Sequence, residues 1–501
     1  MELIFQEKKI QYLRQILNES VFLEQTADLI VPDSLSDIDR VVDAHGTAIL
    51  RSADCTALGV STEGTVQAGA LFVGQDGQLH NLSVQIPFSA RKDFATQQEN
   101  CSLQCKCTLR NVEARMLNSR KLLIRVGIVC ELAAYAPKEL CTYDIDEPAP
   151  QLQLRRQELP LTLPLTLGEK NFTIHEELEL PNEKPSLDRL LKCLCRMQID
   201  EQKTLGEKAV FKGNLIVHAL YESAEGKPVV HEWSVPFSQY AQLPQELDEA
   251  QLRTQLSLTS FDVEPDSLGD CRRLLLSAGL LAQCIVYGKK SVCVIDDAFC
   301  TDALLTPEFH PERIDGILDC QTLRENLISA YEEPTGGLVD VWMYFDETEK
   351  QRTADEMELS VFICCNVMYY DEKGQIQSVT LRPRYQTRVA LSDHANCSIV
   401  QLDGGEIFAA AGTNGIELRL PITMRVESTA EHDLQVLCGG HIEPLPPEEG
   451  KRPSAILRRL ENCQELWQVA KTYRTSMQTI MEANDLHGEC VPENTMLLIP
   501  L

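Results

Sequence analysis

The sequence has few aromatic residues and too few basic residues to balance its acidic ones. Aromatic side chains make up 6% of the 501 residues, although hydrophobic residues make up 44%, which is ample for several ordinary cores. The chain has 46 lysines and arginines against 75 aspartates and glutamates, for a formal net charge of −29. Phosphates and anionic membranes repel such a chain, so we expect neither nucleic acid nor a membrane surface as a partner. A basic protein partner stays open.

Long apolar runs are also missing. The longest apolar stretch, from Leu274 to Val286, is shorter than the roughly 20 residues of a membrane helix. Residues 1–9 contain no apolar core of a signal peptide. The 19 cysteines are an odd number in a long chain, unlike the short disulfide-rich scaffolds of secreted proteins. We therefore expect a cytoplasmic protein without a membrane span, with reduced thiols buried in apolar strands.

Catalytic and metal-binding motifs are sparse. No His-Glu-x-x-His occurs, and Gly288-Lys-Lys-Ser291 ends like a phosphate-binding loop but has Gln283 where the leading glycine is required. The run Cys101-x3-Cys105-x-Cys107 could be half of a metal site, but its last two cysteines share one face of a predicted strand, with no histidine close in sequence. We predict no catalytic residues, no cofactor and no metal site. A metal at the cysteine run is the less favoured interpretation, and an enzyme is a distant one.

What the chain does have is a long repeat. Residues 29–42 (LIVPDSLSDIDRVV) return at 178–191 (LELPNEKPSLDRLL), and Pro87-Phe-Ser89 returns as Pro236-Phe-Ser238, always 149 residues later. Solenoid repeats have periods of about 20–50 residues, so this period indicates duplicated domains. A third and more divergent copy covers residues 358–383, without a recognisable leader before it.

Each copy has the pattern of β-structure. Two extended runs flank a Gly/Asp turn in residues 64–87, again in 210–237 and again in 358–383, which predicts three β-hairpins. Further apolar runs at 122–130, 274–287 and 416–426 predict a closing strand for each copy. Several short strands in each copy indicate tandem β-sandwich or barrel-like repeats.

Helices are expected at four places within the repeats. Apolar residues at loosely helical spacing predict a leading helix or extended arm over residues 5–29. The Asp-Arg pairs at 39–40 and 188–189 are interpreted as helix starts, because 38/42 and 187/191 are apolar at the i, i+4 spacing of a buried helix face. Residues 323–331 predict a fourth helix. The repeated Asp-Arg pair could instead be an interaction site, which is the less favoured interpretation.

The C-terminal part differs in kind from the repeats. Residues 443–453 are rich in proline and charge, which predicts a short, stiff linker. Beyond them, residues 456–460 predict a strand, Leu466 to Tyr473 a helix, and Met477 to Met481 a second helix capped by Thr475 or Ser476. A closing strand at 496–500 completes a small α+β domain with the order β-α-α-β.

This tail resembles a LysM domain. The resemblance rests on Leu466–Tyr473 (LWQVAKTY), on residues 477–486 and on residues 497–500, and it covers the whole tail. LysM domains that bind chitin or peptidoglycan usually carry Gly-Asp-Thr before Leu-Trp and Pro-Gly-Gln before the last strand. This chain has Cys-Gln-Glu at 463–465 and Pro-Glu-Asn at 492–494, which argues against sugar recognition. The candidate partner- or glycan-binding residues are Gln464, Glu465, Leu466, Trp467, Asn484, Asp485, Leu486, Pro492 and Glu493.

The repeated blocks, joined to such a tail, resemble the SPOCS domains of proteins associated with the spore coat. The match lies in the leader with Val-Pro and Asp-Ile-Asp-Arg-Val at 31–41 and in the hairpin ending Val-Pro-Phe at 235–237, strongly in two copies and weakly in the third. The resemblance implies a non-enzymatic morphogenetic protein in the mother-cell cytoplasm, at the forespore surface. It would tether the coat by binding a coat-basement ATPase through its LysM tail, together with other coat proteins.

The sequence leaves a second function open. In that alternative, Trp467 and the loops around 464–465 and 484–485 would bind the N-acetylglucosamine units of peptidoglycan. The predicted organisation is the same for both functions: an N-terminal helix or arm (1–28), SPOCS repeats at 29–150, 151–300 and 301–442, a linker (443–453) and a LysM domain (454–501).

Overall fold

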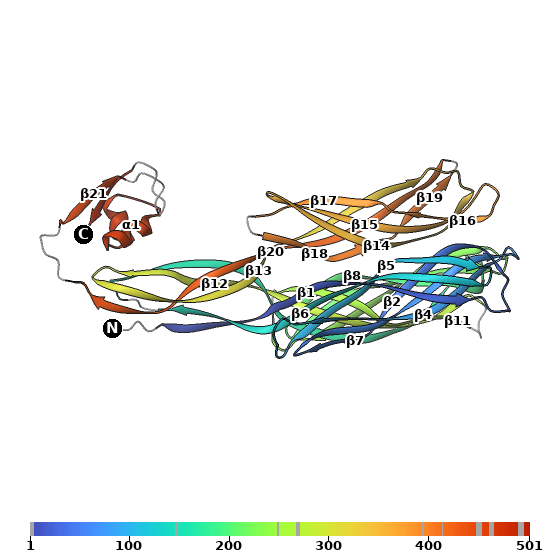
Figure 1. The fold of residues 1–501 in the computed structure, drawn as a ribbon, viewed down its shortest axis with the longest axis horizontal. Helices are drawn as coiled ribbons and strands as arrows, with labels where there is room; N and C mark the ends of the chain where they lie inside the picture. Colours follow the sequence, from blue (N-terminus) through green and yellow to red (C-terminus); the bar gives the residue numbers. More distant parts are fainter. Residues whose placement is uncertain are drawn as a thin grey trace.

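Antiparallel strands make up almost the whole molecule (Figure 1). The computed structural model describes residues 5–145, 149, 151–247, 250–266, 271–392, 395–412, 414–446, 453–459, 465–488 and 495–501. Strands account for 79% of it, and both described helices lie in the C-terminal tail. The predicted mainly β fold with a β-α-α-β end is therefore confirmed.

Three consecutive blocks, each made of two sets of paired strands, form residues 6–444. In block 1 (residues 6–144), one sheet has β1 (Gln6–Ile30), β6 (Lys121–Asp144) and β5 (Ser102–Asn118), and the other has β2 (Ile38–Thr56), β3 (Gly59–Gly74) and β4 (Leu79–Asp93). Block 2 (residues 152–300) repeats this order with β7 (Leu152–Glu179), β12 (Arg273–Cys300) and β11 (Gln251–Pro265), and with β8 (Leu187–Leu205), β9 (Lys208–Ser223) and β10 (Pro228–Gln242).

Block 3 (residues 303–444) is a variation on the same plan. Its long strands are β13 (Ala303–Tyr331) and β20 (Gly415–Pro444), which β18 (Ala395–Gly404) and β19 (Phe408–Gly412) extend. The other sheet has β14 (Gly337–Thr353), β15 (Glu356–Tyr370), β16 (Ile376–Leu381) and β17 (Arg384–Ala390). The divergent third copy thus has two sets of paired strands as its siblings do. A pairing of Ile317 in β13 with Thr162 in β7 joins its long strands to those of block 2 in one seven-stranded sheet.

The three predicted hairpins are confirmed as β3–β4, β9–β10 and β15–β16. Their turns carry Gly77, Gly226 and Gly374, which follow one another after 149 and 148 residues and have φ of 77°, 74° and 74°. A side chain is rarely tolerated at such an angle, so glycine is the natural residue at all three turns. The three closing strands also form, within β6, β12 and β20.

The helices predicted within the repeats are wrong. The first of them is β1 (Gln6–Ile30), which pairs with β6 and so forms the first strand of block 1; of the two structures expected there, the helix is wrong and the chain is extended. The two Asp-Arg segments are the starts of β2 and β8, and residues 323–331 are the end of β13. An i, i+4 spacing places side chains on one face of a helix, but four is even, so it also places them on one face of a strand.

The long strand pairs extend beyond the shorter sheets as a stalk. β1–β6, β7–β12 and β13–β20 contain strands of 24–30 residues, and their ends run together toward the tail (Figure 1). All three pairs contribute to one buried apolar cluster there, composed of Tyr12, Leu140, Leu161, Leu163, Val292, Val294, Ile314, Leu434 and Val436. The stalk is therefore held together by a core of its own.

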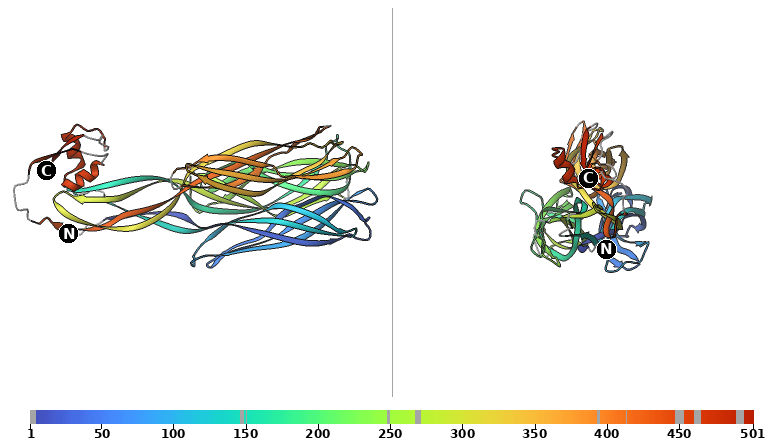
Figure 2. Two further views of the ribbon diagram at one scale, coloured as in Figure 1. Left: turned by 45° about the horizontal axis from the view of Figure 1, so that its top comes forward. Right: turned by 90° about the vertical axis from the view of Figure 1, so that its left-hand side faces the viewer.

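The three blocks are gathered around a common axis. Viewed along the molecule, they form three lobes (Figure 2). Val42, Leu191 and Val339 occupy equivalent positions, 149 and 148 residues apart, and belong to one buried cluster. Residues at equivalent positions can meet one another only close to an axis of approximate threefold symmetry. The next residue of each copy is charged.

Asp43, Lys192 and Asp340 form an ion triad on this axis, with side chains 1–2% exposed. The Lys192 ammonium lies 2.9 Å from a carboxylate oxygen of Asp43 and 2.6 Å from one of Asp340. Burial alone would lower the pKa of Lys192, but the two carboxylates raise it, so the residue stays charged. One ammonium thus joins β2, β8 and β14, one strand from each block.

His218 extends the triad within block 2. Its Nε2 lies 2.7 Å from Asp340 and its Nδ1 lies 2.9 Å from Glu232, which also pairs with both terminal nitrogens of Arg196 at 3.1 Å. Although burial favours the neutral ring, these carboxylates raise the pKa of His218 to about 8. With His218 charged, its imidazolium and the Lys192 ammonium together offset the negative charges of the two aspartates at the axis.

Replacing Lys192 by methionine tests the triad. Lys192→Met leaves the His218 imidazolium as the remaining counter-charge for two buried carboxylates, so we expect the free energy of unfolding to fall by about 3–5 kcal/mol. Lys212→Met is the matched control, because Lys212 is half-exposed and its ion pair with Glu201 spans 3.4 Å. That change should cost less than about 0.5 kcal/mol. Chemical denaturation measures both, and equal losses would contradict the role of the triad.

The charge of His218 predicts a pH dependence of stability. A folded-state pKa of about 8, above the ordinary 6.5, means that the stabilisation is complete below pH 6.5 and is lost as the pH rises through about 8. We expect the free energy of unfolding to fall by about 2 kcal/mol across this interval. His218→Gln should remove most of that slope, whereas His310→Gln, at a half-exposed position, should leave it unchanged. A slope that persists in His218→Gln would refute the assignment.

Candidate functional site

The tail folds around a small buried core, to which Phe299 of β12 also belongs. β21 (Ala455–Arg459) pairs with β22 (Met496–Pro500), and α1 (Leu466–Tyr473) and α2 (Met477–Ala483) lie between them in sequence. Ser476 caps α2, as one of the two predicted caps, by accepting a hydrogen bond from the Thr479 amide at 3.0 Å. The fully buried side chains are Leu466, Ala470, Ile480, Leu497 and Ile499.

The tail is docked on the end of the stalk through Trp467. The indole Nε1 of Trp467 donates a hydrogen bond to Asp297 of β12 at 2.8 Å, and the Lys471 ammonium donates to the other oxygen of the same carboxylate at 2.6 Å. The Trp467 ring meets Phe299 edge to face, with 5.0 Å between centroids. Trp467 is consequently only 6% exposed.

Charge reinforces this contact. Burial would raise the pKa of Asp297, but the donors Lys471 and Trp467 lower it, so the carboxylate stays ionised. Beside it, the Arg155 guanidinium donates to Asp296 at 2.8 Å and to Glu465 of the tail at 3.1 Å. Two ionic contacts and one aromatic contact therefore join the stalk and the tail.

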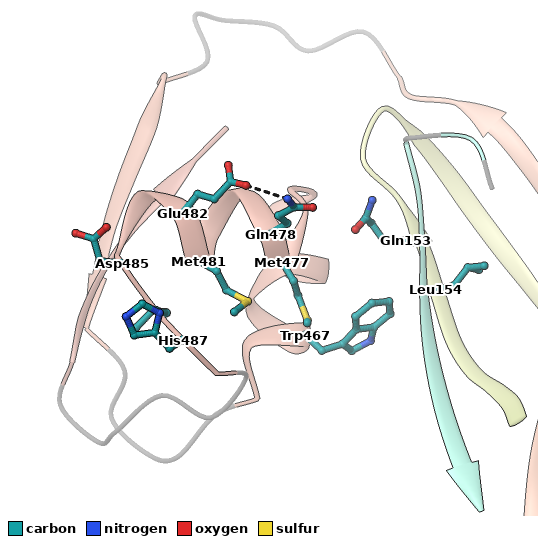
Figure 3. A pocket seen from close by; sticks show the side chains of 10 residues that line it. Gln153, Leu154, Trp467, Met477, Gln478, Met481, Glu482, Asp485 and His487 are labelled. Atoms are coloured by element: carbon teal, nitrogen blue, oxygen red, sulfur yellow. Dashed lines mark hydrogen bonds between the residues drawn. The ribbon is translucent and has the colours of Figure 1, made fainter. Parts of the chain in front are cut away.

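A cavity of about 510 Å³ lies between the tail and the stalk (Figure 3). One wall comes from Trp467, α2 and the residues that follow it, and the other from Gln153 and Leu154 of β7. Its apolar lining residues on the tail are Met477, Met481 and Leu486, and its polar ones are Gln478, Glu482, Asp485 and His487. Flexible methionines beside acidic residues suit a polypeptide ligand with an apolar anchor.

The structure places the predicted site residues in different environments. Gln464, Pro492 and Glu493 lie outside the described residues. Glu465 pairs with Arg155, and Leu466 is fully buried in the tail core. Asn484 binds the backbone, since its amide group donates to the carbonyls of residues 480 and 498 and accepts from the amide of residue 498, each at 2.7 Å.

Three of the nine predicted residues line the cavity: Trp467, Asp485 and Leu486. Three further residues, Asp297, Phe299 and Arg155, belong to the stalk and position the tail, and they were not predicted from the sequence. One signal was available: Asp296 and Asp297 interrupt the apolar run of residues 292–299, and buried carboxylates require partners.

In the described part of the chain, no group of three or more His, Cys, Asp or Glu side chains has the arrangement of a metal site. Its 17 cysteines are free thiols. No described helix has the length and apolar character needed to cross a bilayer. The chain matches no protein-family model, no curated protein and no solved structure.

Asp297→Ala tests how the tail is docked. The change removes two hydrogen bonds to a charged group, so we expect docking to weaken by about 2 kcal/mol while the tail keeps its own core. Acrylamide should quench the fluorescence of Trp467 more strongly in this variant, measured with Trp233 and Trp342 replaced by phenylalanine. Asp302→Ala, at an exposed position after β12, should leave quenching unchanged. Equal quenching in all proteins would contradict the docked arrangement.

Proposed function

We propose that this chain is a non-enzymatic scaffold of the spore envelope that helps to localise the coat at the forespore surface from the mother-cell cytoplasm. In this proposal the three blocks are SPOCS repeats, the tail is a LysM domain, and the tail binds a coat-basement ATPase. The observation that carries the proposal is the cavity of about 510 Å³, whose walls come from the docked tail and the stalk.

The shape of the molecule fits a tether. The stalk separates the tail from the three-block body, so the two ends present different surfaces to different partners (Figure 1). Exposed apolar side chains lie on the blocks, among them Phe22, Leu58, Leu205 and Phe408, each at least 60% exposed. Single exposed apolar residues are ordinary, but several on a repeated body are compatible with contacts to other coat proteins.

The geometry favours a polypeptide ligand over a glycan. Sugar-binding sites place an aromatic face against the ligand, but Trp467 packs on Phe299 and its indole N–H is used by Asp297. The Asn484 side chain is likewise occupied by backbone groups. Because the Trp467 ring and the Asn484 amide are already used in these contacts, the tail has fewer free groups with which to hold N-acetylglucosamine. Peptidoglycan binding remains the alternative function.

A binding experiment with the full chain separates the two functions. We expect the wild-type protein to retain a purified coat-basement ATPase in a pull-down and to stay in the supernatant when peptidoglycan is sedimented. Glu482→Lys combined with Asp485→Lys reverses two charges at the cavity and should weaken ATPase binding by about tenfold or more. Glu225→Lys, on the exposed hairpin turn of block 2, is the control. Sedimentation with peptidoglycan and no ATPase binding would overturn the proposal in favour of the alternative.

A further inference from the structure

Two thiols of block 1 meet at the end of the body formed by the β2–β3 turn. Cys55, near the end of β2, and Cys101, just before β5, have their sulfur atoms 2.7 Å apart, which approaches the roughly 2.05 Å of a disulfide. Both side chains are partly exposed. The two residues are 46 positions apart, so a bond between them would close a long loop.

The backbone holds this pair in place. The segment before Cys101 is attached to the β2–β3 turn by two hydrogen bonds, from the Phe94 amide to the Leu58 carbonyl at 2.8 Å and from the Gln98 amide to the Ala57 carbonyl at 2.9 Å. Asn100 has φ of 53°, a left-handed angle that asparagine tolerates, and it directly precedes Cys101. These backbone contacts therefore bring the two thiols together without a disulfide bond between them.

Block 2 has the same backbone arrangement without the thiols. The equivalent amides of Leu243 and Leu247 bond the carbonyls of residues 207 and 206 at 2.8 and 3.2 Å. At the positions of the two cysteines stand Thr204 and Ala250, joined by a hydrogen bond of 3.4 Å from the threonine hydroxyl to the alanine carbonyl. In block 3 the Arg352 guanidinium reaches the Ala395 carbonyl from the corresponding position.

In each copy a side chain near the end of the second strand thus contacts the segment at the start of the fifth strand. Only in block 1 is that contact made by two sulfur atoms. We propose that Cys55 and Cys101 form a disulfide when the protein meets an oxidising low-molecular-weight disulfide, and that this bond converts the reversible contact of block 1 into a covalent one.

The chemistry is an ordinary thiol–disulfide exchange. The thiolate of one cysteine attacks a sulfur of the small disulfide, forms a mixed disulfide and releases one small thiol. The second cysteine then attacks the protein sulfur of the mixed disulfide and releases the other small thiol. The protein loses two protons and two electrons, and the small disulfide gains them.

The neighbouring cysteines are poorer candidates. Cys105 is fully buried, whereas Cys55 and Cys101 are partly exposed. Burial and a neighbouring thiol raise the pKa of Cys105 and also that of Cys55, so access to the sulfur atoms distinguishes the two sites. The sulfur atoms of Cys107 and Cys130 lie 3.4 Å apart, but within the packed face of β5 and β6. Cys105 and Cys130 are buried, whereas both thiols of the pair at 55 and 101 are partly exposed, so among these five cysteines the bond should form selectively between Cys55 and Cys101.

Peptide mapping of the full chain tests the proposal. The reduced protein is incubated with glutathione disulfide, the remaining thiols are alkylated in denaturant, and the peptides are identified by mass spectrometry. We expect a linked Cys55–Cys101 peptide while Cys105, Cys107 and Cys130 are alkylated. Alkylated Cys55 and Cys101, a glutathione adduct that stops on either residue, or a link to a different cysteine would overturn the proposal.

Two sets of variants sharpen the test. Cys55→Ser should abolish the link, whereas Cys271→Ser, which removes an exposed thiol of block 2, should leave it intact. The double variant Thr204→Cys with Ala250→Cys should gain a second link in block 2, because the surrounding hydrogen bonds are the same. Failure to form this second link would contradict the geometric argument.

Stability provides an independent readout. Closing a loop of this length can raise the ratio of folded to unfolded protein by up to about a thousandfold in the chain-entropy model. The midpoint of chemical denaturation should therefore rise on oxidation in the wild type and stay constant in Cys55→Ser. No rise in the wild type would refute a tie that stabilises the block. The tail takes no part in this experiment, so its outcome is independent of ATPase binding.

Discussion

The position of Lys192 between Asp43 and Asp340 is the constraint on which the arrangement of the three blocks depends. Equivalent residues of an approximate threefold meet at the axis, and three identical charges there would repel one another in a buried environment. Two acids and one base solve this problem with a single ammonium that contacts both carboxylates. The three blocks can therefore assemble only because this position differs among them: block 2 has a lysine where blocks 1 and 3 have an aspartate.

The same constraint explains why the third block remains part of the body although its sequence has diverged most. It supplies Asp340 to the triad, and its Tyr344 hydroxyl accepts a hydrogen bond from the Gly46 amide of block 1 at 3.0 Å. Its Asn366 side chain donates to the Ala44 carbonyl at 3.2 Å. Block 3 can lose its leader motif because these contacts are made by β14 and β15. The residues of block 3 that face the axis, rather than a leader motif, hold this block against the other two.

The sequence predicted the strands well where alternation is simple, and poorly where bulges interrupt it. In β1 a register shift between Gln15 and Leu17 changes the face on which apolar residues lie, so the whole segment shows no single period of two and resembles a helix. Shifts at 38/40 and 41/43 do the same at the start of β2. The β-α-α-β order of the tail was predicted correctly because its helices are short, with apolar residues at helical spacing and a serine cap on α2, and these signals are local. The ion triad could not be predicted, because it joins residues about 150 and 300 positions apart that meet only once the blocks assemble.

The candidate site also depends on a contact between residues far apart in the sequence. A motif comparison of the tail points to the loops at its surface, but the partner of Trp467 lies 170 residues earlier, in β12. Once Asp297 and Phe299 hold this ring, the tail can no longer be regarded as an independent module, because Gln153 and Leu154 of the stalk complete the cavity. A ligand in that cavity contacts two parts of the chain at once. Recognition in the cavity would then depend on the docking of the tail as much as on the residues of the tail itself, because a tail detached from the stalk would lose Phe299 from its buried cluster and one wall of the cavity.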